Sequence, residues 1–164
     1  MIFVTVGNHP QGFVRLLKKI DELARTMKIA DAFLQIGYSN YIPKYCSYTR
    51  FVGFNEFQDL IKKSNIVITH GGEGSIGNAL FHNKPTIVVP RLKRLGEHTN
   101  DHQVQLTNAL KKEEMIIAVY DIENLEDAVV KAKDFKPKIA NRKNNIIDQI
   151  EDYLIEAGLI PKKG

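Results

Sequence analysis

Residues 66–80 read Ile-Val-Ile-Thr-His-Gly-Gly-Glu-Gly-Ser-Ile-Gly-Asn-Ala-Leu. The β-branched run at 66–69 predicts a buried strand, and the residues from Ser75 onward predict a helix. Ser75 could cap that helix or donate its hydroxyl to a ligand. Glycines let a backbone approach an anion closely, and a helix N-terminus directs N–H groups at it. The stretch therefore predicts a phosphate-binding loop that begins at His70. An ordinary strand-to-helix turn also uses Gly and Ser, so the loop alone does not name a ligand.

The composition indicates one soluble domain. The chain has 164 residues, of which 43% are hydrophobic, which is enough for one core and a single domain over 1–164. The single cysteine, Cys46, allows no internal disulfide, and no secretory signal or spanning run of about 20 apolar residues is found, so we expect a cytoplasmic protein. The net charge of +4 favours anionic partners, whether nucleotide, anionic lipid or nucleic acid.

Short β-branched or aromatic runs alternate with amphipathic segments along the chain. This alternation predicts an α/β fold, a doubly wound, Rossmann-like and mostly parallel sheet of six strands with helices on both faces. We expect strands near 2–6, 32–37, 49–52, 66–69, 86–89 and 116–119. We expect helices near 13–27, 55–63, 75–82, 98–112, 123–133 and 144–157.

The common doubly wound strand order places the first and fourth strands side by side, where ligands bind beyond the carboxyl ends. That order brings the loop Gly7-Asn8-His9-Pro10 next to the loop 70–75. A diphosphate could then lie between the two loops. Taken alone, Gly7 is as compatible with a simple tight turn as with a ligand contact.

Several common nucleotide motifs are absent from the sequence. The loop after the first strand lacks the three-glycine dinucleotide fingerprint, and no Gly-Lys-Ser/Thr triplet of an NTPase loop occurs. NAD and ATP chemistry are therefore disfavoured. No Asp-x-Asp pair is present to hold a divalent ion against a diphosphate. We expect no metal and no cofactor, with a helix N-terminus neutralising the phosphates instead.

A second stretch rich in charged and polar residues, Pro90 to Gln103, follows the fifth strand. In a helix over 98–112, His98 and His102 would share one face and, with Glu97 and Asp101, could ligate zinc. The metalloprotease pattern requires Glu directly after the first His, where Thr99 stands, so zinc is disfavoured. The alternatives are a set of hydrogen-bonding groups that read sugar hydroxyls at a crevice rim, or ordinary capping and surface roles.

Four strings together resemble one family. They are Val4-Thr5-Val6-Gly7, the loop 70–75, Lys84-Pro85-Thr86-Ile87-Val88-Val89-Pro90 and Gly96-Glu97-His98-x-x-Asp101-His102-Gln103. Over residues 2–130 the chain resembles the donor-binding, C-terminal domain of the family 28 glycosyltransferases, which have the GT-B fold. It is most similar to single-domain subunits of two-chain enzymes, such as the eukaryotic pair that adds GlcNAc to a dolichol-linked sugar. The last string is the more particular one, and it resembles the bacterial capsule and exopolysaccharide pairs.

The resemblance implies a UDP-sugar site. The diphosphate would lie at Gly71, Gly72, Gly74 and Ser75, uracil at the backbone of Gly53 and Phe54, and the sugar near Asp101, His102 and Gln103. Relatives usually carry Glu at position 78 to bind ribose, whereas this chain has Asn78, whose amide has one acceptor oxygen. The full expected binding set is Gly7, Asn8, His9, Gly53, Phe54, His70, Gly71, Gly72, Gly74, Ser75, Asn78, Glu97, His98, Asp101, His102 and Gln103.

The resemblance also implies an activity that needs a second chain. The activity is inverting transfer of a hexose, galactose as first guess, from a UDP-sugar to a lipid-diphosphate-linked sugar in capsular or exopolysaccharide synthesis. A membrane-anchored partner would bind the acceptor and supply the catalytic base, which would hold this chain at the cytoplasmic face of the membrane. The apolar face of the helix expected over 144–157 is a candidate docking element, although burial against its own sheet explains it equally well.

Two other function classes remain compatible with the sequence. A UDP-sugar epimerase or hydrolase shares the architecture, but normally has both domains in one chain and several acidic residues in the cleft. A non-catalytic module that binds a nucleotide sugar or nucleic acid is the third class. Nucleic acid is not the expected partner, because the aromatic residues are not interleaved with the basic run at 131–143.

Overall fold

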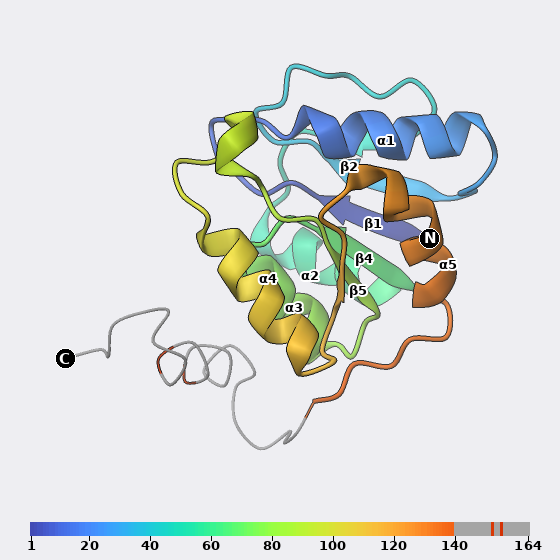
Figure 1. Ribbon diagram of the computed structural model, residues 1–164. Helices are drawn as coiled ribbons and strands as arrows, with labels where there is room; N and C mark the ends of the chain where they lie inside the picture. Colours follow the sequence, from blue (N-terminus) through green and yellow to red (C-terminus); the bar gives the residue numbers. More distant parts are fainter. Residues whose placement is uncertain (140–151, 153–154, 156–164) are drawn as a thin grey trace.

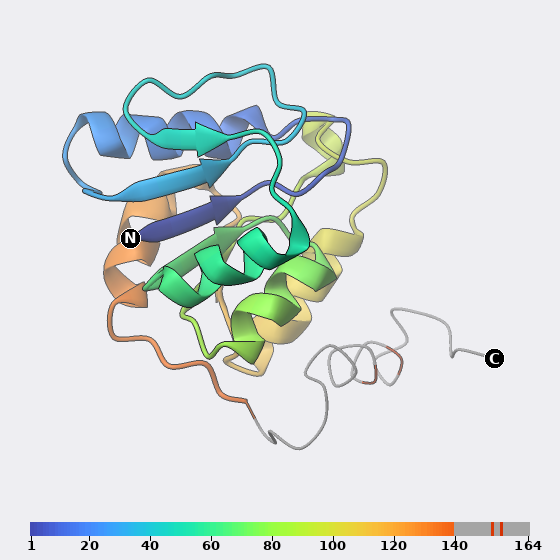
Figure 2. The same cartoon turned by 180° about the vertical axis from the view of Figure 1, so that it is seen from behind.

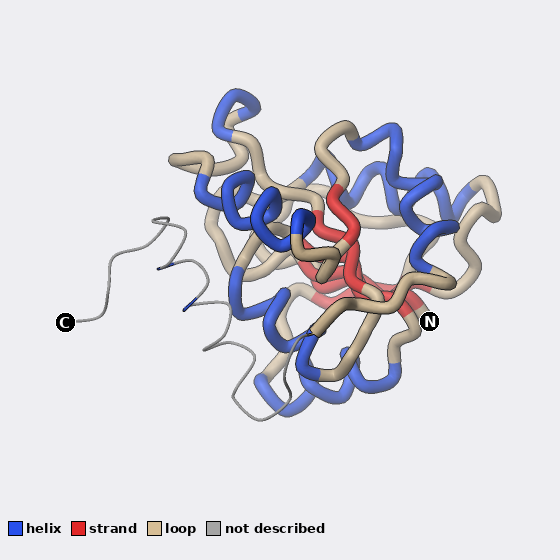
Figure 3. The backbone as a smooth tube through the Cα atoms, turned by 60° about the horizontal axis from the view of Figure 1, so that its bottom comes forward, coloured by secondary structure: helices blue, strands red, loops and turns tan. Residues whose placement is uncertain are grey.

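The computed structural model describes residues 1–139, 152 and 155. Within them the chain forms a six-stranded, all-parallel sheet in the order β3-β2-β1-β4-β5-β6 (Figures 1 and 3). This is the expected doubly wound topology, with Thr5 at the end of β1 beside Thr69 at the end of β4. The strands are β1 (Ile2–Thr5), β2 (Ala32–Gln35), β3 (Ser47–Thr49), β4 (Ile66–Thr69), β5 (Thr86–Val88) and β6 (Ile117–Ala118).

Helices cover both faces of the sheet, as predicted. One face carries α1 and α5, and the other carries α2, α3 and α4 (Figures 1 and 2). The α-helices are α1 (Val14–Arg25), α2 (Phe54–Lys63), α3 (Glu73–Phe81), α4 (His102–Lys112) and α5 (Leu125–Ala132). Two 3-10 turns, η1 (Lys93–Leu95) and η2 (Ile122–Asn124), precede α4 and α5 in the chain.

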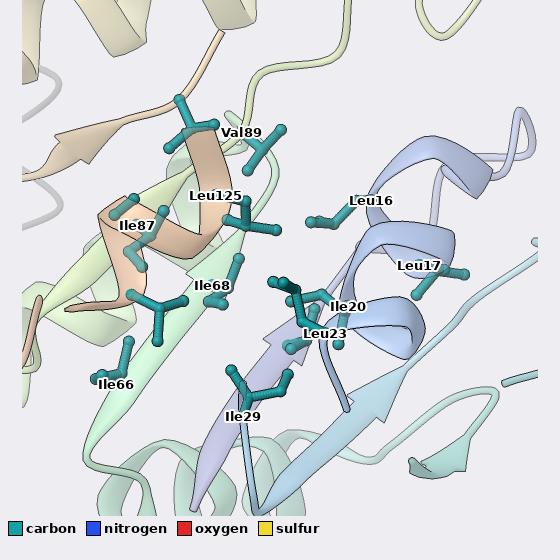
Figure 4. Close-up of a cluster of buried hydrophobic side chains, with 14 of the residues drawn as sticks. Leu16, Leu17, Ile20, Leu23, Ile29, Ile66, Ile68, Ile87, Val89 and Leu125 are labelled. Carbon is teal, nitrogen blue, oxygen red and sulfur yellow. The ribbon is translucent and has the colours of Figure 1, made fainter. Parts of the chain in front are cut away.

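The core follows from the alternation of side chains along each strand. Ile68 of β4 lies beside Ile20 of α1 in the larger apolar cluster, to which Ile66 and Leu16 also belong (Figure 4). Val67, between them, packs on the other face in a cluster with residues of α2 and α3. Each fully buried Leu or Ile contributes about 1.5–3 kcal/mol to folding, so the central strands are held firmly from both sides. This rigid sheet positions the loops that follow β1 and β4.

Three predicted boundaries are wrong, one at the end of a strand and two at helix starts. The third strand covers 47–49 rather than 49–52, because Thr49 lies opposite Gln35, the last residue of β2, and later residues have no strand beside them. The third helix begins at Glu73 rather than Ser75, with Gly72 as an extended N-cap. The fourth helix begins at His102 rather than at residue 98.

The late start of α4 has a chain of local hydrogen bonds as its cause. The N–H of Asn100 donates to Nδ1 of His98 at 3.3 Å, and the N–H of His102 donates to Oδ1 of Asn100 at 3.1 Å. Side chains that bond the backbone two residues on compete with helix formation. Residues 99–101 therefore form bends ahead of the helix.

The helix predicted over 144–157 lies outside the described residues, except for positions 152 and 155, which are helical. Its role as a docking element stays a prediction. In the part of the chain that the structure describes, no helix combines the length and the apolar character that a membrane span requires.

Candidate functional site

A cleft of about 440 Å³ opens at the carboxyl end of the sheet, between the loops that follow β1 and β4. Its volume is in the range of small-molecule sites. Among the described residues, no Asp, Glu, Lys or Arg side chain lines it. Its lining residues are Thr5, Gly7, Asn8, Gln35, Val52, Phe54, Phe57, His70, Gly72, Gly74, Ser75 and Asn78.

The N-terminus of α3 faces this cleft. The first backbone bond at this end of the helix runs from the N–H of Ile76 to the oxygen of Gly72. The three preceding N–H groups, of Glu73, Gly74 and Ser75, have no partner within the helix, as at every helix start. A Cβ placed on Gly74 would meet no atom within 4 Å. This end of the helix therefore offers unpaired donors and open space, the two features that an anion site needs.

The expected cap at Ser75 is wrong. Gly72 is the N-cap residue, and no side chain makes a capping hydrogen bond there. Ser75 is the third residue of the helix and lines the cleft. Ser75 is thus placed where it could contact a ligand in the cleft.

The imidazole of His70 lies in a slot between two glycines. A Cβ on Gly7 would lie 2.6 Å from Cε1 of His70, and one on Gly72 would lie 2.4 Å from its Nε2. Gly7 also has a φ of +70°, which L side chains rarely adopt. Burial, reinforced by the nearby Arg91 guanidinium, lowers the pKa of His70 to about 3. The ring is therefore neutral at physiological pH.

Gly71 and Gln103 hold the loop from behind rather than lining the cleft. Oε1 of Gln103 accepts hydrogen bonds from the N–H of Gly71 at 3.1 Å and of Arg91 at 3.0 Å. A Cβ on Gly71 would lie 2.6 Å from Cβ of Gln103, so only glycine lets α4 pack this closely. Gln103 is 8% exposed and joins two loops. The N–H of Gly71 already donates to Gln103 and is not available to a phosphate. A phosphate in this loop would have to bind to the residues after Gly71.

Asn78, the expected ribose contact, lies in the cleft wall within a chain of amides. Its Nδ2 donates to the oxygen of Gly74 at 2.7 Å, and its Oδ1 accepts from Nε2 of Gln58. Oε1 of Gln58 is in turn 2.8 Å from Nε2 of His82. Asn78 therefore has a fixed orientation, with its acceptor oxygen already engaged.

Two lining residues, Thr5 and Gln35, were missed by sequence reasoning. The hydroxyl of Thr5 donates to Oε1 of Gln35 at 2.6 Å, and Nε2 of Gln35 donates to the oxygen of Gly7 at 3.2 Å and to Oδ1 of Asn8 at 3.4 Å. The pair thus shapes the loop after β1. A signal was present, since each is a polar residue inside an apolar strand at its carboxyl end.

The expected uracil residues stand at the start of α2. Gly53 is an extended N-cap, and a Cβ there would meet nothing within 4 Å. The side chain of Phe54 is 73% exposed and lines the cleft. Val52 and Phe57, which also line it, were not predicted. An exposed aromatic ring beside an open backbone is a suitable surface for a planar base.

His9 and His98 stack on one another outside the lining of this cleft. Their ring centroids are 4.8 Å apart at 30°. Nδ1 of His9 accepts the N–H of Gln11 at 3.3 Å, which places the proton of the neutral ring on Nε2. Burial, with Arg91 and His98, lowers the pKa of His9. The prediction that His98 shares a helical face with His102 is wrong, because His98 precedes the helix.

Glu97, Asp101 and His102 do not line the cleft either. The carboxylate of Glu97 holds Arg15 in a two-pronged ion pair at 2.8 and 2.9 Å and lines a second cavity of about 480 Å³. Oδ1 of Asp101 accepts the N–H of Lys93 at 3.3 Å, and Nδ1 of His102 is 3.1 Å from Oε1 of Gln105. Across residues 1–139, 152 and 155, no three His, Cys, Asp or Glu side chains are grouped to hold a metal ion.

The sequence model of the glycosyltransferase family 28 C-terminal domain matches residues 1–156. The chain belongs to this family. The predicted family is thereby confirmed, and with it the expected Rossmann-like fold.

Similar proteins include a named transferase subunit. The UDP-N-acetylglucosamine transferase subunit ALG13 of Cryptococcus neoformans, in two strains, is 38% identical over 77 residues. That match covers 46% of this chain and 36% of the relative, so the similarity spans about a third of the relative's length.

Solved structures share the fold at low sequence identity. The solution structure of ALG13 has a TM-score of 0.59 at 19% identity and covers 94% of each chain. The kitacinnamycin glycotransferase has a TM-score of 0.56 at 16% identity over 96% of this chain and 39% of that one. The UDP-GlcNAc 2-epimerase from Neisseria meningitidis has a TM-score of 0.58 at 14% identity over 94% of this chain and 43% of that one. At these identities the likeness shows the fold alone.

Proposed function

We propose that this chain is the donor-binding subunit of an inverting glycosyltransferase. The cleft between the loops after β1 and β4 would hold the UDP part of a UDP-sugar, with its diphosphate at the N-terminus of α3. The unpaired N–H groups of Glu73, Gly74 and Ser75, together with the open space at Gly74, are the observation that carries this proposal. Membership of the glycosyltransferase family 28 C-terminal domain supports it.

The proposed reaction is a displacement at the anomeric carbon of the sugar. An acceptor hydroxyl oxygen forms the new bond to that carbon, the bond from the carbon to the UDP oxygen breaks, and UDP leaves with the electron pair. The donors at the start of α3 would stabilise the charge that develops on the leaving diphosphate. In this proposal no metal ion takes part.

The base that removes the acceptor proton would come from a second chain. Among the residues that line the cleft, His70 has a pKa of about 3 and none is a carboxylate. His9 is also a poor base, because Nδ1 accepts the N–H of Gln11 and Nε2 carries the proton. The ALG13 relatives are named as transferase subunits, which supports a two-chain enzyme. The partner would bind the acceptor and anchor the pair at the cytoplasmic face of the membrane.

The acceptor in this proposal is a lipid-diphosphate-linked sugar of capsular or exopolysaccharide synthesis, and the first candidate donor is UDP-galactose. The ALG13 relatives are named for UDP-N-acetylglucosamine, so that donor is the principal alternative. UDP-glucose and UDP-glucuronate complete the set to be compared.

Transfer with and without a partner tests this proposal. The chain is purified alone and co-expressed with the neighbouring glycosyltransferase gene product, and each preparation is supplied with radiolabelled UDP-sugars and lipid extract. We expect label in the lipid fraction only when both chains are present, and with one preferred UDP-sugar. Transfer that is equally fast with Ser75→Ala and Gly74→Val in this chain would contradict the assigned site.

A UDP-sugar epimerase is the second candidate, because the solved 2-epimerase matches the fold as well as the transferases do. Epimerisation requires groups that remove and return a proton, and none of the described residues that line the cleft is a carboxylate. Product analysis after incubating the chain alone with UDP-GlcNAc separates the two functions. An epimerised nucleotide sugar would favour this second candidate.

A further inference from the structure

Arg91, which follows β5, is a fully buried cation that joins three loops. Its exposed fraction is 0%. Nη2 donates to the oxygen of Val6 at 2.8 Å, and Nη1 donates to the oxygens of Gln11, Gly12 and Glu97. Its backbone N–H shares Oε1 of Gln103 with Gly71, the residue after His70.

Among the described residues, no carboxylate makes a hydrogen bond to Arg91. Its guanidinium bonds only backbone oxygens there, lies 4.8 Å from the ring centroid of Phe13, and leaves Nε without a partner. Glu97, the acid whose charge acts on Arg91, makes its two-pronged ion pair with Arg15. The three side chains together carry a net charge of +1. Burial lowers the pKa of Arg91 to about 10, so the group stays charged at neutral pH.

Burying a cation is expensive, and an apolar residue of similar size would make a more stable core. A retained buried charge therefore needs another reason. The cleft beside it supplies one, because no charged side chain in the described part of the chain lines that cleft and a nucleoside diphosphate brings about two to three negative charges.

Arg91 is within electrostatic reach of this cleft. It bonds Val6, and the next residue, Gly7, lies against the ring of His70. Its charge contributes to the lowered pKa of His70, which lines the cleft, and of His9, on the loop after β1. A charge inside the protein is screened far less by solvent and salt than one on the surface.

We propose that Arg91 is the positioning residue of the donor site and its buried counter-charge: it fixes the loops after β1 and β4 and attracts the diphosphate without touching it. This inference rests on the proposed function, since it names the ligand's charged part. It assigns the preference for a diphosphate over an uncharged nucleoside to one side chain.

The test compares UDP with uridine, which lacks the phosphates, by NMR titration of the full chain. We expect Arg91→Gln to weaken UDP binding about tenfold and uridine binding by about twofold or less. Arg91→Lys, which keeps the charge and loses the forked hydrogen bonds, should keep most of the UDP-to-uridine ratio. Arg94→Gln removes the same charge from an exposed position of η1 and should leave the ratio unchanged. Equal losses for both ligands in Arg91→Gln would overturn the inference and leave a purely structural role.

A second readout is the titration of His70, followed by its ring signals. Removing the Arg91 charge should raise the pKa of His70, and Arg94→Gln should not. If Arg91→Gln does not fold, the salt dependence of binding to the wild-type chain is the deciding measurement. The ratio of the UDP affinity to the uridine affinity should fall less than about threefold between about 50 and 500 mM NaCl. A steeper fall would assign the attraction to surface cations. Wild-type chain that binds neither ligand would instead contradict the proposed function, whatever the variants do.

Discussion

Two glycines of the phosphate loop should respond in opposite ways to the same substitution. In Gly72→Ala the added Cβ would lie 2.4 Å from Nε2 of His70, closer than a Cβ can approach, so the buried ring or the loop would have to shift. Overpacking of this kind costs about 1–3 kcal/mol. In Gly74→Ala the Cβ meets nothing within 4 Å, and the residue is helical, so the variant should gain about 0.4–1 kcal/mol.

Urea unfolding at pH 7 measures both variants against wild type. The predicted order of stability is Gly74→Ala, wild type, then Gly72→Ala, with the variants separated by about 1.5–4 kcal/mol. The order of UDP affinity should differ, because the methyl group of Gly74→Ala occupies the space in which we place the phosphate. Gly72→Ala as stable as wild type, or Gly74→Ala that binds UDP as tightly as wild type, would refute the geometry of the loop.

Three further predictions follow from the site. The native pKa of His70 is about 3, below its ordinary value of 6.5, so between these pH values the unfolded chain binds more protons than the native chain. The free energy of unfolding should therefore drop by about 1.4 kcal/mol for each pH unit below pH 6.5. Urea unfolding at pH 7, 6 and 5 measures this slope, and His70→Asn should flatten it. Glu73, an exposed acid in the first turn of α3, should repel the diphosphate. Glu73→Gln should therefore tighten UDP binding about two- to fivefold, measured by calorimetry at low salt. An unchanged affinity would count against this phosphate position. A double-mutant cycle with Arg15→Met and Glu97→Gln, measured by thermal unfolding, should give a coupling free energy of about 1–3 kcal/mol, since both side chains are less than a fifth exposed. Additive losses of stability would show that the pair is not coupled.

The fold was predictable because its signals are local and mutually consistent. The run 66–69 is buried on both faces of a parallel sheet, and such strands read as continuous apolar stretches. The doubly wound order then followed from the alternation of strands and helices, and it brought Gly7 next to the loop after β4. What failed were boundaries set by tertiary pairing, such as the end of β3, which depends on where β2 stops.

The site was predictable only in part. Gly72, Gly74 and Ser75 line the cleft as expected, because the predicted strand order places the loop after β4 at the carboxyl edge of the sheet, beside the loop after β1. Gln103 points into the protein instead, and a sequence does not show which side of a helix start a polar residue will take. The role of Arg91 was not predicted either. Its partners are backbone oxygens from distant loops, and the spacing of residues in the sequence does not indicate such bonds.

Backbone NMR of the full chain during a UDP titration is the sharpest test of a donor site at the loop after β4. We expect saturable shifts of the amides of Glu73, Gly74 and Ser75. Uridine should shift Gly53 and Phe54 but leave the α3 amides nearly unchanged, and NAD and ATP at the same concentration should cause neither set of shifts. Saturable UDP binding that leaves the α3 amides unmoved, or no binding at all, would contradict a donor site at the loop after β4.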